Sequence, residues 1–149
     1  MEEHNLLPNT HIGGRIGRSC DHALHRWTER VYQSWRQGDS VVSGLTLDMA
    51  GAFDNAVRAR IQHNLLKRRI PTTIIDYIVS ILTERSTTLV LQEGTVGGMV
   101  PVDTGIPQGS PLSGILYLFY NAELIDHIHK KFASKALVIG YIDDIAILV

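Results

Sequence analysis

The chain has 149 residues, 44% of them hydrophobic and 19% charged, which suffices for one domain with a single core. Its formal net charge of -1 excludes a uniformly basic protein, so contacts to a polyanion would have to come from local basic clusters. The single cysteine, Cys20, excludes an internal disulfide framework and favours a reducing compartment. Residues 104–122 are uncharged, but their prolines and glycines argue against a membrane-spanning helix.

The first predicted helix covers residues 20–37. It follows Ser19, a residue type that commonly caps helix N-termini, and glycine, aspartate and serine break it at 38–40. Apolar residues recur along it at helical spacing and are expected to face the core: Leu24, Trp27, Val31 and Trp35. Residues 41–47 then predict a strand that ends at Asp48 and is followed by a second helix.

That second helix is predicted over residues 55–70, a run with basic but no acidic residues. Its inner stripe is expected at Val57, Ile61 and Leu65. Two interpretations of the basic face stay open: contact with a phosphate backbone, or an ordinary solvated face whose positive end suits the helix dipole. The spacing of Thr73 and Asp76 predicts a capping box on a third helix.

Residues 87–92 and 96–102, joined by residues 93–95, predict a β-hairpin. The loop that follows is punctuated by glycine and proline, and Ser110 with Pro111 gives a strong start signal for a long helix. Apolar residues of this helix are expected to lie beneath a sheet: Leu112, Ile115, Leu116, Phe119 and Leu124.

Two apolar runs, 136–139 and 145–149, predict a terminal hairpin whose last strand forms a sheet edge. Strands separated by helices indicate an α+β fold with an antiparallel sheet packed on helices, not a helix bundle. Asp143 and Asp144 lie at the hairpin tip, and Asp48 lies at another strand end. Neighbouring carboxylates repel each other and supply the hard oxygen ligands that Mg²⁺ prefers, although a solvated turn is the simpler interpretation of the tip alone.

Three segments, in this order, resemble motifs A, B and C of reverse transcriptases: LDMAGAFD at 47–54, GIPQGSPLS at 105–113 and YIDD at 141–144. The stretch from His4 to Leu24 is similar to the segment before motif A in retrotransposons lacking long terminal repeats, which are LINE-like elements. The resemblance covers nearly the whole chain. It implies a polymerase palm with part of the fingers, about 1–40 being fingers-proximal and about 41–149 being palm.

The resemblance implies an RNA-directed DNA polymerase, a nucleotidyltransferase that joins a dNTP to a primer 3′-hydroxyl by a two-metal mechanism. Asp48, Asp143 and Asp144 would be the catalytic residues. Together with the Met49 carbonyl they would hold two Mg²⁺ ions, for which Mn²⁺ can substitute. Phe53 matches the aromatic residue that excludes a ribose 2′-hydroxyl, and Asp54 is expected to make a structural hydrogen bond.

Other positions in the motifs imply contacts to the substrates. Gln108 and Gly109 match the nucleotide pocket, and Tyr141 matches a position that supports the primer end. Candidate contacts to an RNA template and DNA primer also come from basic residues: Arg15, Arg18, Arg58, Lys67 and Arg68.

The chain lacks the family's further fingers strands, motif D lysine, primer grip and thumb, so we expect a fragment without polymerase activity of its own. A parent polyprotein would supply the missing fingers, thumb and endonuclease regions. A catalytically inactive remnant that binds nucleic acid, or the reverse transcriptase of a mobile group II-type intron, is the alternative. For a retroelement protein we expect no membrane association and an intracellular location, in nucleus or cytoplasm.

Overall fold

A computed structural model describes residues 2–38, 41–91, 94, 96–132 and 135–149. The chain forms four helices and five strands within these residues, and the fold is α+β as predicted. In chain order the elements are α1 (Cys20–Arg36), β1 (Gly44–Leu47), α2 (Arg58–Lys67), α3 (Thr72–Leu82), β2 (Arg85–Val90), β3 (Val96–Val102), α4 (Pro111–Phe132), β4 (Leu137–Tyr141) and β5 (Asp144–Leu148).

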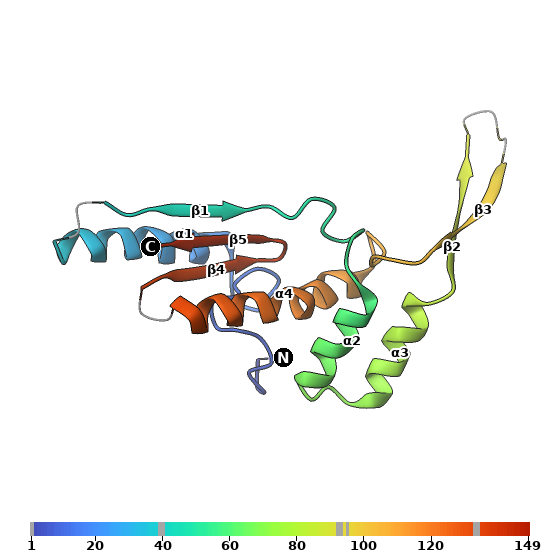
Figure 1. Ribbon diagram of the computed structural model, residues 1–149, viewed down its shortest axis with the longest axis horizontal. Coiled ribbons are helices and arrows are strands. Elements are labelled where there is room, and N and C mark those ends of the chain that lie inside the picture. Colours follow the sequence, from blue (N-terminus) through green and yellow to red (C-terminus); the bar gives the residue numbers. More distant parts are fainter. Residues whose placement is uncertain (1, 39–40, 92–93, 95, 133–134) are drawn as a thin grey trace.

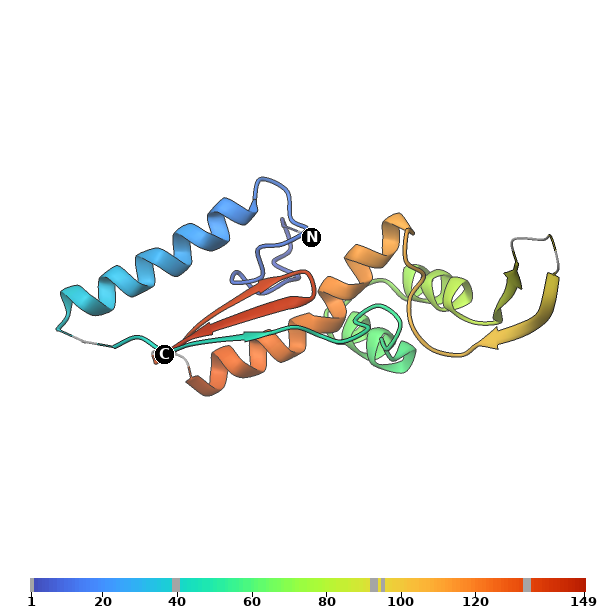
Figure 2. The ribbon, with the colours of Figure 1, turned by 90° about the horizontal axis from the view of Figure 1, so that it is seen from above.

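Motifs A and C lie at an antiparallel three-stranded sheet with the order β1-β5-β4. One face packs on α4, where Ile125 and Ile128 meet Val138 and Ile145. The other face lies against α1, and Figure 2 shows the sheet between these two helices. Because side chains alternate along a strand, the side chains of each strand divide between an α4 face and an α1 face.

The last strand is central, which corrects the prediction that residues 145–149 form an edge. β5 pairs with β4 through the hairpin and with β1 on its other side. Burial explains this order, since Ile145 and Leu148 are buried and a central strand satisfies the backbone groups of both its edges. The two edges of the sheet are β1 and β4, and an isolated bridge from His11 to Gly140 covers part of the β4 edge.

A second core holds α2 and α3 against α4, with Ile61 and Leu65 of α2 buried there as predicted. Val57 precedes the helix and is exposed, because residues 50–55 form turns and α2 begins only at Arg58. A helix therefore follows the strand as predicted, but it covers Arg58–Lys67 and is shorter than the predicted 55–70. The capping box at Thr73 is wrong, since α3 begins at Thr72 behind Pro71 and has no side-chain cap bond within the described residues.

α1 begins after Ser19 as predicted, and the Ser19 backbone N–H donates to His22 Nδ1 at 3.0 Å. Its apolar stripe is not buried in the core, however. Leu24 and Trp35 are exposed, while Trp27 and Val31 are half-buried. The helix packs mainly against β4, so helical spacing located the correct face but overestimated what covers it.

The β2–β3 hairpin is present as predicted, although parts of its connection, residues 92, 93 and 95, lie outside the described residues. It forms its own two-stranded sheet and projects from the end of the molecule (Figure 1). α4 begins at Pro111 as predicted, with Leu116 and Phe119 buried, but Ile115 and Leu124 face solvent. Within the described ranges, no helix has the length and apolar character needed to cross a membrane.

Candidate active site

The strand register brings the three predicted acidic residues to one end of the sheet. Leu47 pairs with Ile145, so continuing the antiparallel register by one residue places Asp48 opposite Asp144. Asp144 also pairs with Tyr141 across the β4–β5 turn. Residues directly opposite each other project from the same face, which here is the face towards α1. Asp143 lies in the turn, directly before Asp144.

The electrostatics show that these carboxylates interact. The pKa of Asp144 is raised by burial and by the negative charges of Asp143 and Asp48. Asp48 lies far from Asp144 in the sequence, so the effect of its charge on Asp144 is a product of the fold. Among the described residues, no three His, Cys, Asp or Glu side chains converge as a ready-made metal site. The carboxylate oxygens of Asp48, Asp143 and Asp144 nevertheless suit a hard divalent cation, which would relieve the repulsion between these acids.

Backbone hydrogen bonds fasten the end of motif A to the motif B loop. The Ile106 N–H donates to the Phe53 carbonyl at 2.8 Å, and the Thr104 hydroxyl donates to the Asp54 carbonyl at 2.8 Å. Gly105 has a φ of 73°, and a Cβ there would lie 2.5 Å from the Asp54 oxygen. Only glycine allows so close an approach in that conformation, so Gly105 is what permits the two motifs to meet.

The predicted nucleotide-pocket residues lie along this junction. The half-buried Phe53 ring stacks on Tyr117 of α4, with centroids 5.1 Å apart and planes 25° apart. Gln108 is exposed, and its Nε2 lies 3.4 Å from both carboxylate oxygens of Asp54, which supports the structural role expected for Asp54. Gly109 is exposed with a φ of 86°, and within the described residues a Cβ there would touch nothing within 4 Å.

Two further predicted residues flank the acids. Met49 follows Asp48, is half-buried and lines a cavity of about 490 Å³ between α2 and α4. Tyr141 is also half-buried, and with Asp144 it lines a cavity of about 200 Å³ beside α1.

Arg15 is buried, and its predicted contact with nucleic acid stays a prediction. Its guanidinium pairs with Glu2 and donates to the Pro8 carbonyl at 2.8 Å and the His11 carbonyl at 3.2 Å. Burial costs an arginine much less when all its donors find acceptors, so this residue folds the N-terminal segment. Arg18 is half-buried and donates to the Asn9 carbonyl at 2.6 Å, and its contact with nucleic acid stays a prediction.

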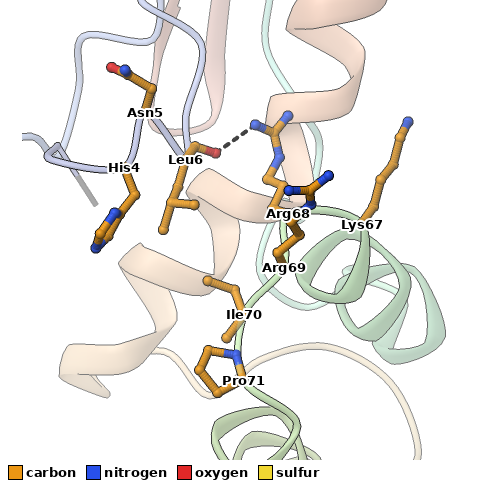
Figure 3. Close-up of a pocket in the computed structure, with 8 residues that line it drawn as sticks. All are labelled: His4, Asn5, Leu6, Lys67, Arg68, Arg69, Ile70 and Pro71. Atoms are coloured by element: carbon orange, nitrogen blue, oxygen red, sulfur yellow. Dashed lines mark hydrogen bonds between the residues drawn. The ribbon is translucent and has the colours of Figure 1, made fainter.

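The basic residues of α2 are also engaged within the protein. Arg58 donates to the Val102 carbonyl and thereby fastens the base of the β2–β3 hairpin. Arg68 pairs with Asp126 at 2.6 Å and with Glu123 at 3.3 Å, and Figure 3 shows it donating to the Leu6 carbonyl. The predicted nucleic-acid contacts of Arg58 and Arg68, both half-buried, stay predictions. Lys67 pairs with Glu123 but its side chain is 57% exposed, so its contact stays a prediction.

The cavity in Figure 3 measures about 570 Å³ and lies between the N-terminal segment and the α2–α3 connection. It is basic at Lys67, Arg68 and Arg69, but the acids Glu123 and Asp126 already neutralise the first two. This cavity is separate from the carboxylates at the end of the sheet.

Sequence reasoning missed three residues beside the acids: His11, Tyr117 and Asn121. His11 is buried behind β4, and burial lowers its pKa to about 4. Burial and the charge of Asp143 raise the pKa of Tyr117 to about 12. The useful signal was the four-residue spacing of Ser113, Tyr117 and Asn121, which places three buried polar side chains on one face of α4.

Comparison with known proteins gives consistent results. The family model described as reverse transcriptase (RNA-dependent DNA polymerase) matches residues 1–149. Two Drosophila melanogaster proteins are similar in sequence. The probable RNA-directed DNA polymerase from transposon BS is 30% identical over 99% of this chain and 16% of that protein. The RNA-directed DNA polymerase from mobile element jockey is 27% identical over 95% of this chain and 15% of that protein.

Two solved telomerase structures share the fold at low sequence identity. Telomerase from Candida albicans, in complex with a TWJ fragment of telomeric RNA, has a TM-score of 0.74 and 11% identity over 100% of this chain and 28% of that one. Apo telomerase from Candida tropicalis, truncated from its C-terminal domain, has a TM-score of 0.71 and 14% identity over 88% of this chain and 29% of that one. The chain thus belongs to the reverse transcriptase (RNA-dependent DNA polymerase) family, as a LINE-like domain.

Proposed function

We propose that the chain is the catalytic part of an RNA-directed DNA polymerase that adds deoxynucleotides to a primer 3′-hydroxyl on an RNA template. The observation that carries this proposal is the strand register, which puts Asp48, Asp143 and Asp144 at the same end of the sheet. Membership of the reverse transcriptase family supports the same reaction. The chain spans about a sixth of the length of the curated relatives that it matches.

Reverse transcriptases generally use divalent metal ions. Asp48, Asp143 and Asp144 would hold two Mg²⁺ ions, with the Met49 carbonyl as a further oxygen and Mn²⁺ as a substitute. When bound, such ions activate the attacking hydroxyl and neutralise the leaving pyrophosphate, a mechanism for which polymerases are an established example. The protein's own contribution is to hold Asp48 and Asp144 opposite each other at one end of the sheet, with Asp143 in the adjoining turn.

Phe53 would select the sugar of the incoming nucleotide. Its ring is supported by Tyr117 and its backbone is fixed to the motif B loop, so it presents a rigid flat surface. Gln108, held towards motif A by Asp54, and the bare backbone of Gly109 would contact the nucleotide. Such positioning supplies much of the catalysis in phosphoryl transfer, which needs little covalent chemistry from the protein.

An RNA template and a DNA primer are the proposed macromolecular partners. Tyr141 beside Asp144 would support the primer end, while Arg18, Arg58, Lys67 and Arg68 are candidates for backbone contacts. A contact of Lys67 or Arg18 with phosphate would make binding weaken with salt, because each such contact releases counterions.

The proposal is tested by grafting the 149 residues into the jockey-element polymerase in place of its homologous segment. We expect the graft to extend a DNA primer on an RNA template with Mg²⁺, and an otherwise identical graft carrying Asp143→Asn to bind the template–primer without extending it. Equal extension by both grafts would contradict the assigned role of Asp143. A folded graft that binds template–primer and dNTP but never extends would contradict the proposed function.

A further inference from the structure

The turn that carries the catalytic acids has an unfavourable backbone conformation. Ile142 is the first residue between β4 and β5 and has a φ of 56°. Glycine is the usual residue at such a position of a two-residue hairpin turn, and a β-branched side chain is strained there. Strain of this kind persists only where surrounding contacts enforce it. Asp143 and Asp144 follow directly, so their placement depends on those contacts.

One enforcing contact comes from α4. The side-chain Nδ2 of Asn121 donates to the Ile142 carbonyl at 3.3 Å, across 21 positions of sequence. Asn121 is 3% exposed, so this bond forms away from water, where an unpaired carbonyl is costly. On the other side, the backbone of Gly13 lies against the turn, and a Cβ there would be 2.6 Å from the Ile142 nitrogen.

We infer that Asn121 is a positioning residue for the catalytic acids, acting through the Ile142 carbonyl. This inference rests on the proposed function of Asp143 and Asp144. Without the amide donor, the Ile142 peptide is free to rotate towards an unstrained conformation, and the two acids that follow it move away from Asp48. The consequence is weaker binding of a divalent cation, in addition to any loss of stability.

Asn64 of α2 offers a matched control. It is 0% exposed, and its Nδ2 donates to the Phe119 and Tyr120 carbonyls at 3.1 Å each. Asn64 therefore has the same side chain as Asn121 and bonds to α4, the helix that carries Asn121. Its amide donates to these α4 carbonyls and not to the turn. Replacing either asparagine by leucine, which has nearly the same shape, removes a buried amide donor. Only the Asn121 change releases the turn.

The experiment measures Mn²⁺ affinity by electron paramagnetic resonance, and thermal stability, for the 149-residue chain and for Asn121→Leu, Asn64→Leu and Asp143→Asn. We expect Asn121→Leu to weaken Mn²⁺ binding about tenfold, as loss of a bond that orients metal ligands commonly does. Asn64→Leu should lower the melting temperature and leave the affinity unchanged. If a leucine variant fails to fold, the smaller pair Asn121→Ala and Asn64→Ala replaces it.

Wild-type affinity in a folded Asn121 variant, or an equal loss of affinity in both asparagine variants, would overturn the positioning role. The Asp143→Asn arm tests the proposed function separately. Loss of Mn²⁺ binding in that variant supports the metal site whatever Asn121 does. Equal Mn²⁺ binding by the wild type and Asp143→Asn would overturn both the metal site and the role of Asn121.

Discussion

The two hairpins of this molecule are held in opposite ways. The β4–β5 hairpin is part of a three-stranded sheet between α1 and α4. The N-terminal segment forms hydrogen bonds with both the N–H and the carbonyl of Gly140 in this hairpin. The β2–β3 hairpin pairs only with itself and is fastened at its base by Arg58 and Arg85. Figure 1 shows the first enclosed by other elements and the second projecting from them.

This difference has a physical meaning for the site. Catalytic carboxylates must be held within a fraction of an ångström, which requires packing on every side of the turn that carries them. The β2–β3 hairpin exposes large apolar side chains, including Leu89 and Met99, and a two-stranded hairpin alone is only marginally stable. It is therefore expected to open locally at little cost to the site, whereas the β4–β5 hairpin opens only with the whole domain.

Large-to-small substitutions should give the largest contrast. Ile145→Ala on the buried face of β5 is expected to cost about 2–5 kcal/mol of unfolding free energy, because it leaves a cavity against α4. Met99→Ala on β3 should change it by less than about 0.5 kcal/mol, since Met99 is 76% exposed. Urea unfolding measures both. Similar costs at the two positions would contradict the distinction between the hairpins.

Lowering the pH should weaken the catalytic hairpin through His11. The pKa of this buried histidine is about 4, below its ordinary value of 6.5, so between these values the unfolded chain binds more protons than the folded one. The stability held above the unfolded pKa is then lost as the pH falls towards 4, by roughly 3 kcal/mol at most.

His11→Gln should remove this part of the pH dependence while keeping a polar side chain of similar size. The measurement is urea unfolding from about pH 7 to about pH 5, where the histidine contribution dominates over carboxylates. The control is His25→Gln on the exposed side of α1, which should retain the wild-type slope. A wild-type slope in His11→Gln would show that His11 does not titrate on unfolding.

Adding a methyl group should distinguish the hairpins by steric fit. A Cβ on Gly13 would lie 2.6 Å from the Ile142 nitrogen, whereas a Cβ on Gly98 of β3 would have nothing within 4 Å in the described part of the chain. Gly13→Ala is expected to cost about 1–3 kcal/mol and to displace the catalytic turn. Gly98→Ala should be neutral or slightly stabilising. Equal melting temperatures for the two variants would contradict the close contact at Gly13.

The smallest expected effect concerns charge repulsion within the site. Burial, Asp143 and Asp48 raise the pKa of Asp144, which means that the ionised form is disfavoured in the folded state. Asp144→Asn should therefore raise the melting temperature slightly without divalent ions. Added Mg²⁺ should stabilise the wild type more than this variant, because it binds the folded site. A variant less stable than the wild type in the absence of Mg²⁺ would refute this explanation.

Local chemistry made much of the catalytic end predictable. Ser110 and Pro111 marked the start of α4 correctly, and the apolar runs around residues 141–144 defined the β4–β5 hairpin. Asp48 was expected at a strand end because the preceding residues are apolar and extended, and it follows β1 as expected. These features depend on neighbours within a few residues, which the sequence displays directly.

Features that depend on distant partners were not predictable in the same way. Strand order made β5 central, although its position at the end of the sequence suggested an edge. Arg15 looked like a surface cation beside a glycine, but its acceptors at Glu2, Pro8 and His11 bury it. Asn121 resembled an ordinary helix residue, and only the fold shows the Ile142 carbonyl opposite its amide.

The central claim is that Asp48 and Asp143, which lie far apart in the sequence, serve one cation site. A double-mutant cycle in Mn²⁺ affinity tests it most directly, with Asp48→Asn, Asp143→Asn and the double variant each checked for folding. If the acids share a site, each single change should weaken binding strongly, and the double change should cost much less than their sum. Wild-type Mn²⁺ affinity in a folded Asp48→Asn variant, or fully additive losses, would contradict the claim.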